Sequence, residues 1–293
     1  MIFTLALCLS AALATAQQSP KSRVPAPWLI ILPPKMVAGE QATLAVLDSR
    51  GRLLPSALVE LPNGQNVTTG ATGRAMFKAP DEPGTMIARI SARGIHASAN
   101  VLAFDDPSLH AASQGSTGRV AVRSYPHVVA IHDRFTVEGF GFRGAADSNH
   151  LYLNDDACLV VASSPASLVV LPGPRVPVGD VNLHISVAGV DAGQFPISAV
   201  LLEFSGPEAG VNAGSVGDLT LRARGTTEPL LLEVRNGSPG VIELSKGNVQ
   251  RVKTSGGDEN TAPIEVKFVT GGNYSVSARL LSAELQQTQE HTR

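Results

Sequence analysis

The sequence Asp133-Arg-Phe-Thr-Val-Glu-Gly-Phe-Gly-Phe142 is an alternating run that ends in two glycines and a second phenylalanine. Val137 and Phe142 are five positions apart, so on a regular strand they would face opposite sides of the sheet. Gly139 and Gly141 tolerate the backbone of a bulge or corner, where one extra residue changes the parity of the strand. We therefore expect Val137 and Phe142 to enter one core, as in a β-sandwich.

The composition of the rest of the chain favours the same fold class. Gly and Pro are frequent, at 28 and 20 of 293 residues, and they separate short apolar segments at short intervals. Almost no amphipathic helical period occurs outside the N-terminal segment, apart from a polar tail at residues 283–293 that is typical of a frayed or disordered end. The sequence predicts an all-β protein of three tandem Ig-like β-sandwich modules after a signal peptide.

The N-terminal segment, residues 1–16, is uncharged and apolar and ends in Ala14-Thr-Ala16, which fits a signal peptidase site. We expect cleavage before Gln17 and secretion, to the periplasm or outside the cell. This run is too short to span a membrane, and no other segment is long enough. Lipidation of Cys8 is disfavoured, because Leu7 stands where a small residue is expected.

Net charge and cysteine content argue against a nucleic-acid-binding protein and against a disulfide-stabilised one. The formal net charge of −2 gives no electrostatic footprint for nucleic acid. After cleavage Cys158 is the only cysteine, so no intramolecular disulfide can form. Cys158 lies in an apolar segment without a basic neighbour, which predicts a packing residue rather than a reactive thiol.

In residues 24–104, short segments of alternating apolar and polar residues predict the strands of one β-sandwich. The predicted strands are residues 28–32, 42–47, 57–61, 74–77, 86–91 and 97–104. The segments Val46–Gly51, Thr69–Phe77 and Pro83–Ala88 resemble the signature of bacterial Ig-like domains of the invasin/intimin type, and transthyretin-like carboxypeptidase regulatory domains carry a similar one. The resemblance implies an Ig-like module of a bacterial protein.

Residues 119–200 follow a polar linker at 105–118. The predicted strands are residues 120–126, 135–142, 151–154, 168–172, 179–187 and 194–200. The opening strand that ends in Pro126, the Phe135–Phe142 run and the closing strand pair resemble the IPT/TIG domain, an Ig-like fold of receptors, bacterial surface proteins and carbohydrate-active enzymes. His132 departs from the glycine that is usual in that family.

Residues 201–282 show the same alternation of apolar and polar residues and predict a third β-sandwich. This module resembles no family beyond the general Ig-like fold. Its predicted strands are residues 219–223, 230–234, 241–244, 249–252, 264–269 and 274–281. The last strand of the 119–200 module runs directly into residues 201–204, which predicts a stiff join. The polar composition of residues 105–118 predicts a mobile join between the first two modules.

Two motifs resemble a dinucleotide-binding or metal-binding site, but each is better explained by a structural role. Gly139–Gly144 spells G-x-G-x-x-G, but a strand rather than a phosphate-binding helix is expected after it, so no dinucleotide site is predicted. His127 and His132 are an odd number of residues apart, which places them on opposite faces of an extended segment. We interpret them and Asp133 as solvated turn residues rather than metal ligands.

No cofactor is expected, with calcium as the alternative left open. Asp105, Asp106, Asp155 and Asp156 lie in or near predicted loops, and carboxylates are the ligands that calcium prefers. Asp147 is a further loop carboxylate. Acidic residues are also common in turns and caps, and no ligand-spacing motif accompanies these.

The leading functional prediction is a monomeric, secreted, non-catalytic protein with a binding or spacer role at or outside the cell surface. Its partner would be an unidentified protein or surface glycan, held by loops or exposed strand edges. The alternative is a polysaccharide-binding accessory protein, against which the low aromatic content speaks, since only Trp28, Tyr125, Tyr152 and Tyr274 are available as ring platforms. A hydrolase is disfavoured, because no paired acid and base or activated nucleophile is visible.

Overall fold

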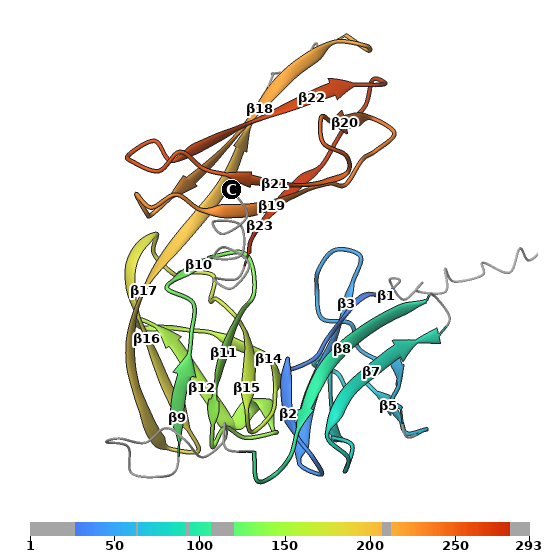
Figure 1. Cartoon of the computed structure of the whole chain (residues 1–293), viewed down its shortest axis with the longest axis vertical. Coiled ribbons are helices and arrows are strands. Elements are labelled where there is room, and N and C mark those ends of the chain that lie inside the picture. Colours follow the sequence, from blue (N-terminus) through green and yellow to red (C-terminus); the bar gives the residue numbers. More distant parts are fainter. Residues whose placement is uncertain (1–26, 63, 92–93, 107–119, 207–211, 282–293) are drawn as a thin grey trace, which may run out of the picture.

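The regular structure of the chain is all β, which confirms the predicted fold class (Figure 1). The computed structural model describes residues 27–62, 64–91, 94–106, 120–206 and 212–281. In these ranges there is no α-helix, and no helix is long and apolar enough to cross a membrane. The predicted signal peptide, the polar tail and all of the linker except Asp105 and Asp106 lie outside the described residues.

Three large apolar clusters form the interior, and we call the parts of the chain around them the first, second and third lobes. The first cluster lies within residues 30–101 and the second within residues 120–199. The third is built from residues 200–268 together with Ala130. In Figure 1 the first lobe is blue to teal, the second green to yellow and the third orange to red.

The strands of the first lobe bury alternate side chains in its core. They are β1 (Pro27–Ile31), β2 (Lys35–Val37), β3 (Gln41–Asp48), β4 (Leu58–Glu60), β5 (Asn66–Thr68), β6 (Arg74–Lys78), β7 (Gly84–Ile90) and β8 (Ile95–Leu102). In β7, Met86, Ala88 and Ile90 point inward and the residues between them are exposed, as a half-buried strand requires. Strand β3 is instead buried on both faces, so something other than the first core must cover its second face.

The second lobe contains the run of alternating residues around Val137. Its elements are β9 (Ala121–Ser124), β10 (Val128–Ala130), β11 (Phe135–Phe140), the 3-10 turn η2 (Ala146–Ser148), β12 (Asn149–Leu153), β13 (Asp156–Ala157), β14 (Leu159–Ser163), β15 (Ser167–Leu171), β16 (Gly179–Val187) and β17 (Val190–Ser205). Val137 and Phe142 both lie in the second core, 0% and 2% exposed. Gly141 follows β11 with a φ of +77°, a conformation that favours glycine, and the chain turns there so that Phe142 enters the core.

The bulge beside this run differs from the expected one. Glu138 and Gly139 are consecutive on β11, but their partners on β9 are Ser124 and Val122, so the extra residue is Arg123 of the neighbouring strand. Gly139 is required for another reason. A Cβ atom at this position would lie 2.1 Å from the carbonyl oxygen of Ala121, so the two backbones approach too closely for any side chain.

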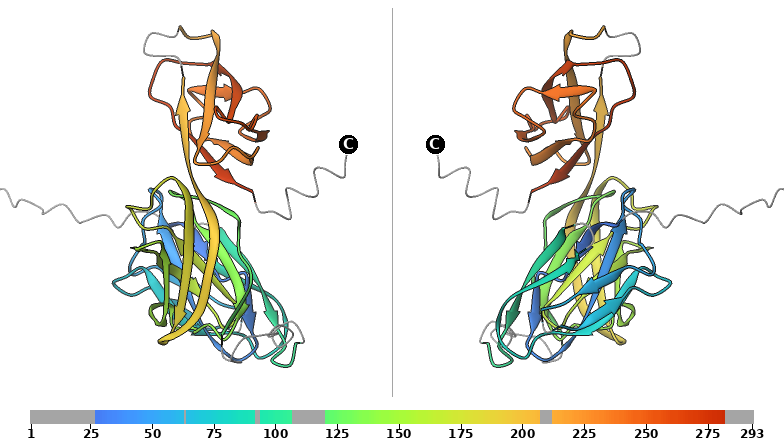
Figure 2. Two further views of the ribbon diagram at one scale, coloured as in Figure 1. Left: turned by 90° about the vertical axis from the view of Figure 1, so that its left-hand side faces the viewer. Right: turned by 90° about the vertical axis from the view of Figure 1, so that its right-hand side faces the viewer.

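The third lobe is joined to the second by one long strand. Its own strands are β18 (Val216–Arg224), β19 (Leu231–Asn236), β20 (Ile242–Leu244), β21 (Val249–Lys253), β22 (Thr261–Phe268) and β23 (Val276–Leu280). Strand β17 has 16 residues; it pairs with β16 along the second lobe and with β18 from Leu201 to Ser205. The sheet β13-β12-β16-β17-β18-β22-β20 therefore extends through both lobes (Figure 2), and the sheet β21-β19-β23 closes the third core. This continuity agrees with the expected stiff join.

The first and second lobes also share a sheet, in the order β1-β3-β14-β15-β11-β9. Strand β3 meets β14 at the pair Thr43 and Ser163. An apolar cluster containing residues of both lobes covers the second face of β3. Its buried members are Ile31, Ala45, Leu47, Val161, Ala162 and Val169.

Polar contacts reinforce this junction. The Arg74 side chain, 10% exposed, donates to the Val160 carbonyl at 3.1 Å and pairs with Asp147 at 2.7 Å. Lys35 pairs with Glu138, also at 2.7 Å. The prediction of a mobile join is therefore wrong for these two lobes, because the composition of residues 105–118 describes the connection and not the contacts between distant strands.

Candidate ligand groove between the second and third lobes

Two adjoining cavities lie between the second and third lobes, and we call them together the lobe groove. The first cavity, of about 430 Å³, lies between the turn that joins β10 to β11 and strands β19 and β23. The second, of about 440 Å³, lies between β9 to β11 and the loop that joins β18 to β19. Ala130, Asp133 and Arg134 line both, so the cavities are neighbours. Each volume lies in the range of about 300 to 1,000 Å³ that is typical of ligand sites.

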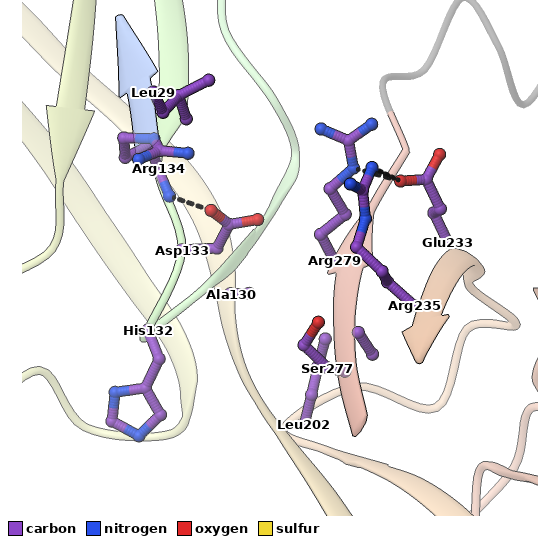
Figure 3. Close-up of a pocket in the computed structure, with 11 residues that line it drawn as sticks. Leu29, Ala130, His132, Asp133, Arg134, Leu202, Glu233, Arg235, Ser277 and Arg279 are labelled. Atoms are coloured by element: carbon purple, nitrogen blue, oxygen red, sulfur yellow. Dashed lines mark hydrogen bonds and ion pairs between the residues drawn. The ribbon is translucent and has the colours of Figure 1, made fainter. Parts of the chain in front are cut away.

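The turn between β10 and β11 forms one wall of the groove. Its backbone is fixed to β17, since the Ile131 N–H donates to the Val200 carbonyl at 3.0 Å. The Asp133 N–H closes the turn on the Ala130 carbonyl at 3.1 Å, and the Asp133 carboxylate accepts the Arg134 N–H at 2.7 Å. The turn is thereby held in one conformation, with Asp133 and Arg134 in the lining (Figure 3).

Strands β19 and β23 form the opposite wall. Glu233 faces Arg279 across the ladder, and Arg235 lies two residues further along β19 on the same face. Glu233 Oε1 accepts from Arg279 Nε at 3.0 Å and from Arg235 Nη2 at 3.4 Å (Figure 3). Burial by itself would raise the pKa of Glu233, but the hydrogen bond and charge of Arg279, and then those of Arg235, hold that pKa below its ordinary value. Both arginines thus share one carboxylate.

Arg134 is the half-buried cation of the groove. Within the residues that the structure describes, its guanidinium makes no hydrogen bond and no ion pair. Burial lowers the pKa of Arg134, the nearby Asp133 carboxylate opposes that shift, and the positive charge of Arg279 adds to it. Arg134 and Arg279 therefore act on each other across the first cavity.

An aromatic side chain lines the second cavity. The Tyr125 ring contacts Phe195, at a centroid distance of 5.0 Å, and His127, at 5.4 Å, and these contacts help to fix its position. Polar side chains share the lining with it. They are Ser124, His127, Thr136, Glu138 and Glu228. The second cavity therefore combines a positioned ring with hydrogen-bond donors and acceptors.

Two carboxylates of the groove are engaged by cations. The Glu138 carboxylate is engaged by Lys35 and the Glu233 carboxylate by two arginines. Among the described lining residues, no hydroxyl is hydrogen-bonded to a histidine or a carboxylate, so the contact that would activate a nucleophile is not formed here.

The four candidate calcium ligands do not converge. Asp105 and Asp106 follow β8 in the first lobe, whereas Asp155 lies in the turn before β13 and Asp156 begins β13 in the second. The Asp156 carboxylate accepts the Arg175 backbone N–H at 2.7 Å. In the described ranges, no three His, Cys, Asp or Glu residues come together as a metal-binding group.

Cys158 lies between β13 and β14, half-buried against the second core. Burial raises the pKa of its thiol to about 11, with a further contribution from the Asp156 charge, while backbone groups of Gly173 and Leu153 oppose the shift. The thiol is thus protonated at neutral pH.

Slow labelling of Cys158 is the expected consequence. Only the thiolate reacts, so in a Cys8→Ser chain we expect alkylation at pH 8 to be on the order of a hundredfold slower in the folded than in the unfolded protein. The folded-state rate should keep rising up to pH 10, because the raised pKa lies above that pH. Native and urea-unfolded rates within tenfold of each other would contradict this expectation.

Sequence reasoning missed most of the groove. His127 and His132 are exposed, in a bend and a turn, as expected of solvated turn residues, but the sequence does not show that they and Asp133 line a groove. Arg235 and Arg279 lie on strands whose sequence shows only alternation, and nothing in either segment marks it as part of a site. Tyr125 is one of the four ring platforms that the sequence offers, but nothing in the sequence places it in a cavity.

Comparison with known proteins assigns no family to the chain. No protein-family model and no curated protein matches it. Solved structures match over most of its length but distantly. SGBP-B from a complex xyloglucan utilization locus in Bacteroides uniformis is 12% identical with a TM-score of 0.29, over 88% of this chain and 99% of that one. SGBP-B of a Bacteroides ovatus mixed-linkage glucan utilization locus, in complex with a mixed-linkage heptasaccharide, is 9% identical with a TM-score of 0.25, over 87% and 68%.

A third match is to domains 1–6 of the surface layer protein SbsC, 12% identical with a TM-score of 0.20, over 88% of this chain and 39% of that one. Likenesses this distant assign no ligand and no role. Membership of the first lobe in the bacterial Ig-like domains and of the second in the IPT/TIG domains stays a prediction.

Proposed function

We propose that this protein is secreted and non-catalytic, and that it binds a polysaccharide in the lobe groove. The observation that carries the proposal is the fixed Tyr125 ring among the polar side chains of the second cavity. Sugar rings have apolar C–H faces and hydroxyl-bearing edges, and an amphipathic ring with nearby donors and acceptors is complementary to both. One positioned aromatic residue offsets the low aromatic content of the chain as a whole.

The architecture around the groove supports the same function. Its two walls belong to lobes that share strand β17, so they are held in place before any ligand arrives. Preorganised walls reduce the entropy that is lost on binding. Two adjoining cavities also give a longer surface than a single monosaccharide needs, which suits a polymer bound over more than one unit.

Substitution of Tyr125 tests the proposal. In the full chain we expect Tyr125→Ala to weaken polysaccharide binding roughly tenfold, since an aromatic contact contributes about 0.5 to 1.5 kcal/mol and about 1.4 kcal/mol corresponds to a factor of ten. Tyr125→Phe should lose less, because it keeps the ring. The measurement is affinity electrophoresis and titration against a panel of neutral and acidic polysaccharides, together with product analysis, which should show no cleavage of the bound polymer.

Tyr152→Ala is the matched control. Tyr152 lies on β12, stacked on His184 at a centroid distance of 6.1 Å, and it lines neither cavity. Equal losses from Tyr125→Ala and Tyr152→Ala would count against a groove site. Release of reducing ends from the polymer would overturn the non-catalytic assignment.

An extended peptide is the second candidate ligand, and the edge of β23 favours it. In the described part of the chain, β23 pairs with β19 alone. The Leu281 N–H donates to the Leu231 carbonyl, and the Gly237 N–H donates to the Ser275 carbonyl. Residues 275 and 281 therefore bond to β19, and the residues that alternate with this set, including Ala278, direct their N–H groups to the open edge of β23. A peptide added there as a strand would be lost in Ala278→Pro, whereas polysaccharide binding at Tyr125 would persist.

A further inference from the structure

The positive charge of the lobe groove is concentrated in its first cavity. Three arginines, Arg134, Arg235 and Arg279, face two carboxylates, Asp133 and Glu233, which leaves a formal excess of one positive charge. The Glu233 carboxylate, 13% exposed, is already engaged by two of the arginines. The cavity therefore offers more donors than its own carboxylates can satisfy.

The Arg134 guanidinium has no hydrogen-bonded partner among the described residues, although the Asp133 carboxylate lies near it. The guanidinium also makes no ion pair within the described ranges, and it lies close enough to Arg279 for the two charges to interact. Like charges that face one cavity repel each other, and a half-buried guanidinium without a hydrogen-bond acceptor is costly. An anion held between these two side chains would offset both costs.

The second cavity has the opposite character. Among the described residues of its lining, the carboxylates are Asp133, Glu138 and Glu228, and the one arginine is the shared Arg134. A negatively charged group is disfavoured there, whereas hydroxyl groups can donate to the carboxylates and accept from Ser124 and its neighbours. The groove thus distinguishes an anionic end from a neutral, hydroxyl-bearing end.

We propose that the ligand of the lobe groove is an acidic polysaccharide, and that Arg134 and Arg279 bind its carboxylate or sulfate group in the first cavity. The neutral part of the sugar lies against Tyr125 in the second cavity. Guanidinium groups match the planar carboxylate and the sulfate oxygens with paired N–H donors, which a lysine cannot reproduce. This inference rests on the proposed polysaccharide-binding function and names the chemical class of the ligand.

The test is titration of the full chain with polygalacturonate, which carries carboxylates, dextran sulfate, which carries sulfate esters, and uncharged dextran and xyloglucan. We expect an acidic polymer to bind more tightly than the neutral ones, and its affinity to fall as salt rises. Arg134→Gln should weaken acidic binding roughly tenfold or more, and by a larger factor than it weakens neutral binding. Arg134→Lys should be intermediate, since it keeps the charge and loses the paired donors. The carboxylate and sulfate arms show which anion is preferred.

Arg89→Gln is the control with the same change of charge. Arg89 is exposed on β7 of the first lobe, and it lines neither cavity. Equal losses from Arg89→Gln and Arg134→Gln would show unspecific attraction and overturn the inference. Arg134→Gln without effect, while Tyr125→Ala still weakens binding, would overturn the acidic class and leave the proposed function standing.

Two further outcomes concern the proposed function itself. If no polysaccharide binds, both the function and the acidic class are overturned. If polyglutamate binds in a way that depends on Arg134 and Ala278 while the polysaccharides do not, the groove is a peptide site and both proposals fail.

Discussion

Gly144→Ala is expected to destabilise the protein by about 3 kcal/mol and to loosen the contact between the first and second lobes. A Cβ atom at residue 144 would lie 2.1 Å from the Gln41 carbonyl oxygen, so the backbones of the two lobes must move apart. The Gly144 carbonyl also accepts hydrogen bonds from Thr43 Oγ1 at 2.6 Å and Ser163 Oγ at 2.8 Å. A shift large enough to fit a methyl group would break both of these bonds.

Urea denaturation and small-angle scattering measure the two consequences, lower stability and a larger radius of gyration. Gly240→Ala is the control, because a Cβ atom at residue 240 meets nothing within 4 Å and the backbone there is not left-handed. Equal stabilities of the two variants would mean that the lobes do not depend on this approach, and that Thr43 and Ser163 can find other partners.

The individual strands were largely predictable, because alternation is a local property. Strand β16 occupies residues 179–187, as its alternating pattern predicts. Strands β2, β5 and β10, each of three residues, were missed, since three residues are too few to show a period. Strand β17 was predicted from residue 194 onward but begins at Val190, where it pairs with the end of β16. Its two halves bury opposite faces, because they serve different cores.

The junction between the first two lobes was not predictable from local patterns. Arg74 and Asp147 contact each other across 73 positions of sequence, and neither segment signals the other. One hint was present in the sequence. Residues 44–47 of β3, Leu-Ala-Val-Leu, are apolar on both faces of the strand, which indicates burial on both sides. That pattern predicts a second packing partner for the strand but does not identify it.

The groove was unpredictable for the same physical reason. Arg134 and Arg279 line one cavity because β17 joins the third lobe to the second, which carries the turn between β10 and β11. Each residue alone looks like an ordinary exposed cation. The charge excess exists only in the assembled structure, so a search of the sequence for motifs does not find it.

Asn260→Ala is expected to cost about 2 to 4 kcal/mol and to abolish ligand binding in the groove. Asn260 is 0% exposed, and its Nδ2 donates to the carbonyls of Thr226 at 3.0 Å and Glu228 at 2.8 Å. Its Oδ1 accepts the Gly256 N–H at 3.0 Å. Alanine would leave these three backbone groups without the partner that holds them, and each buried unpaired group costs about 1 to 3 kcal/mol.

The loss of binding follows from where this loop lies. The loop between β18 and β19 carries Glu228, Pro229 and Leu230, which form one wall of the second cavity. Thermal and urea denaturation give the change in stability, and titration with the polysaccharide bound by the parent chain, under conditions where Asn260→Ala is still folded, gives the change in affinity. Asn182→Ala, at an exposed position of β16, is the control. Unchanged affinity in a folded Asn260→Ala protein would show that the ligand does not use this wall, and would move the site toward the arginines of the first cavity.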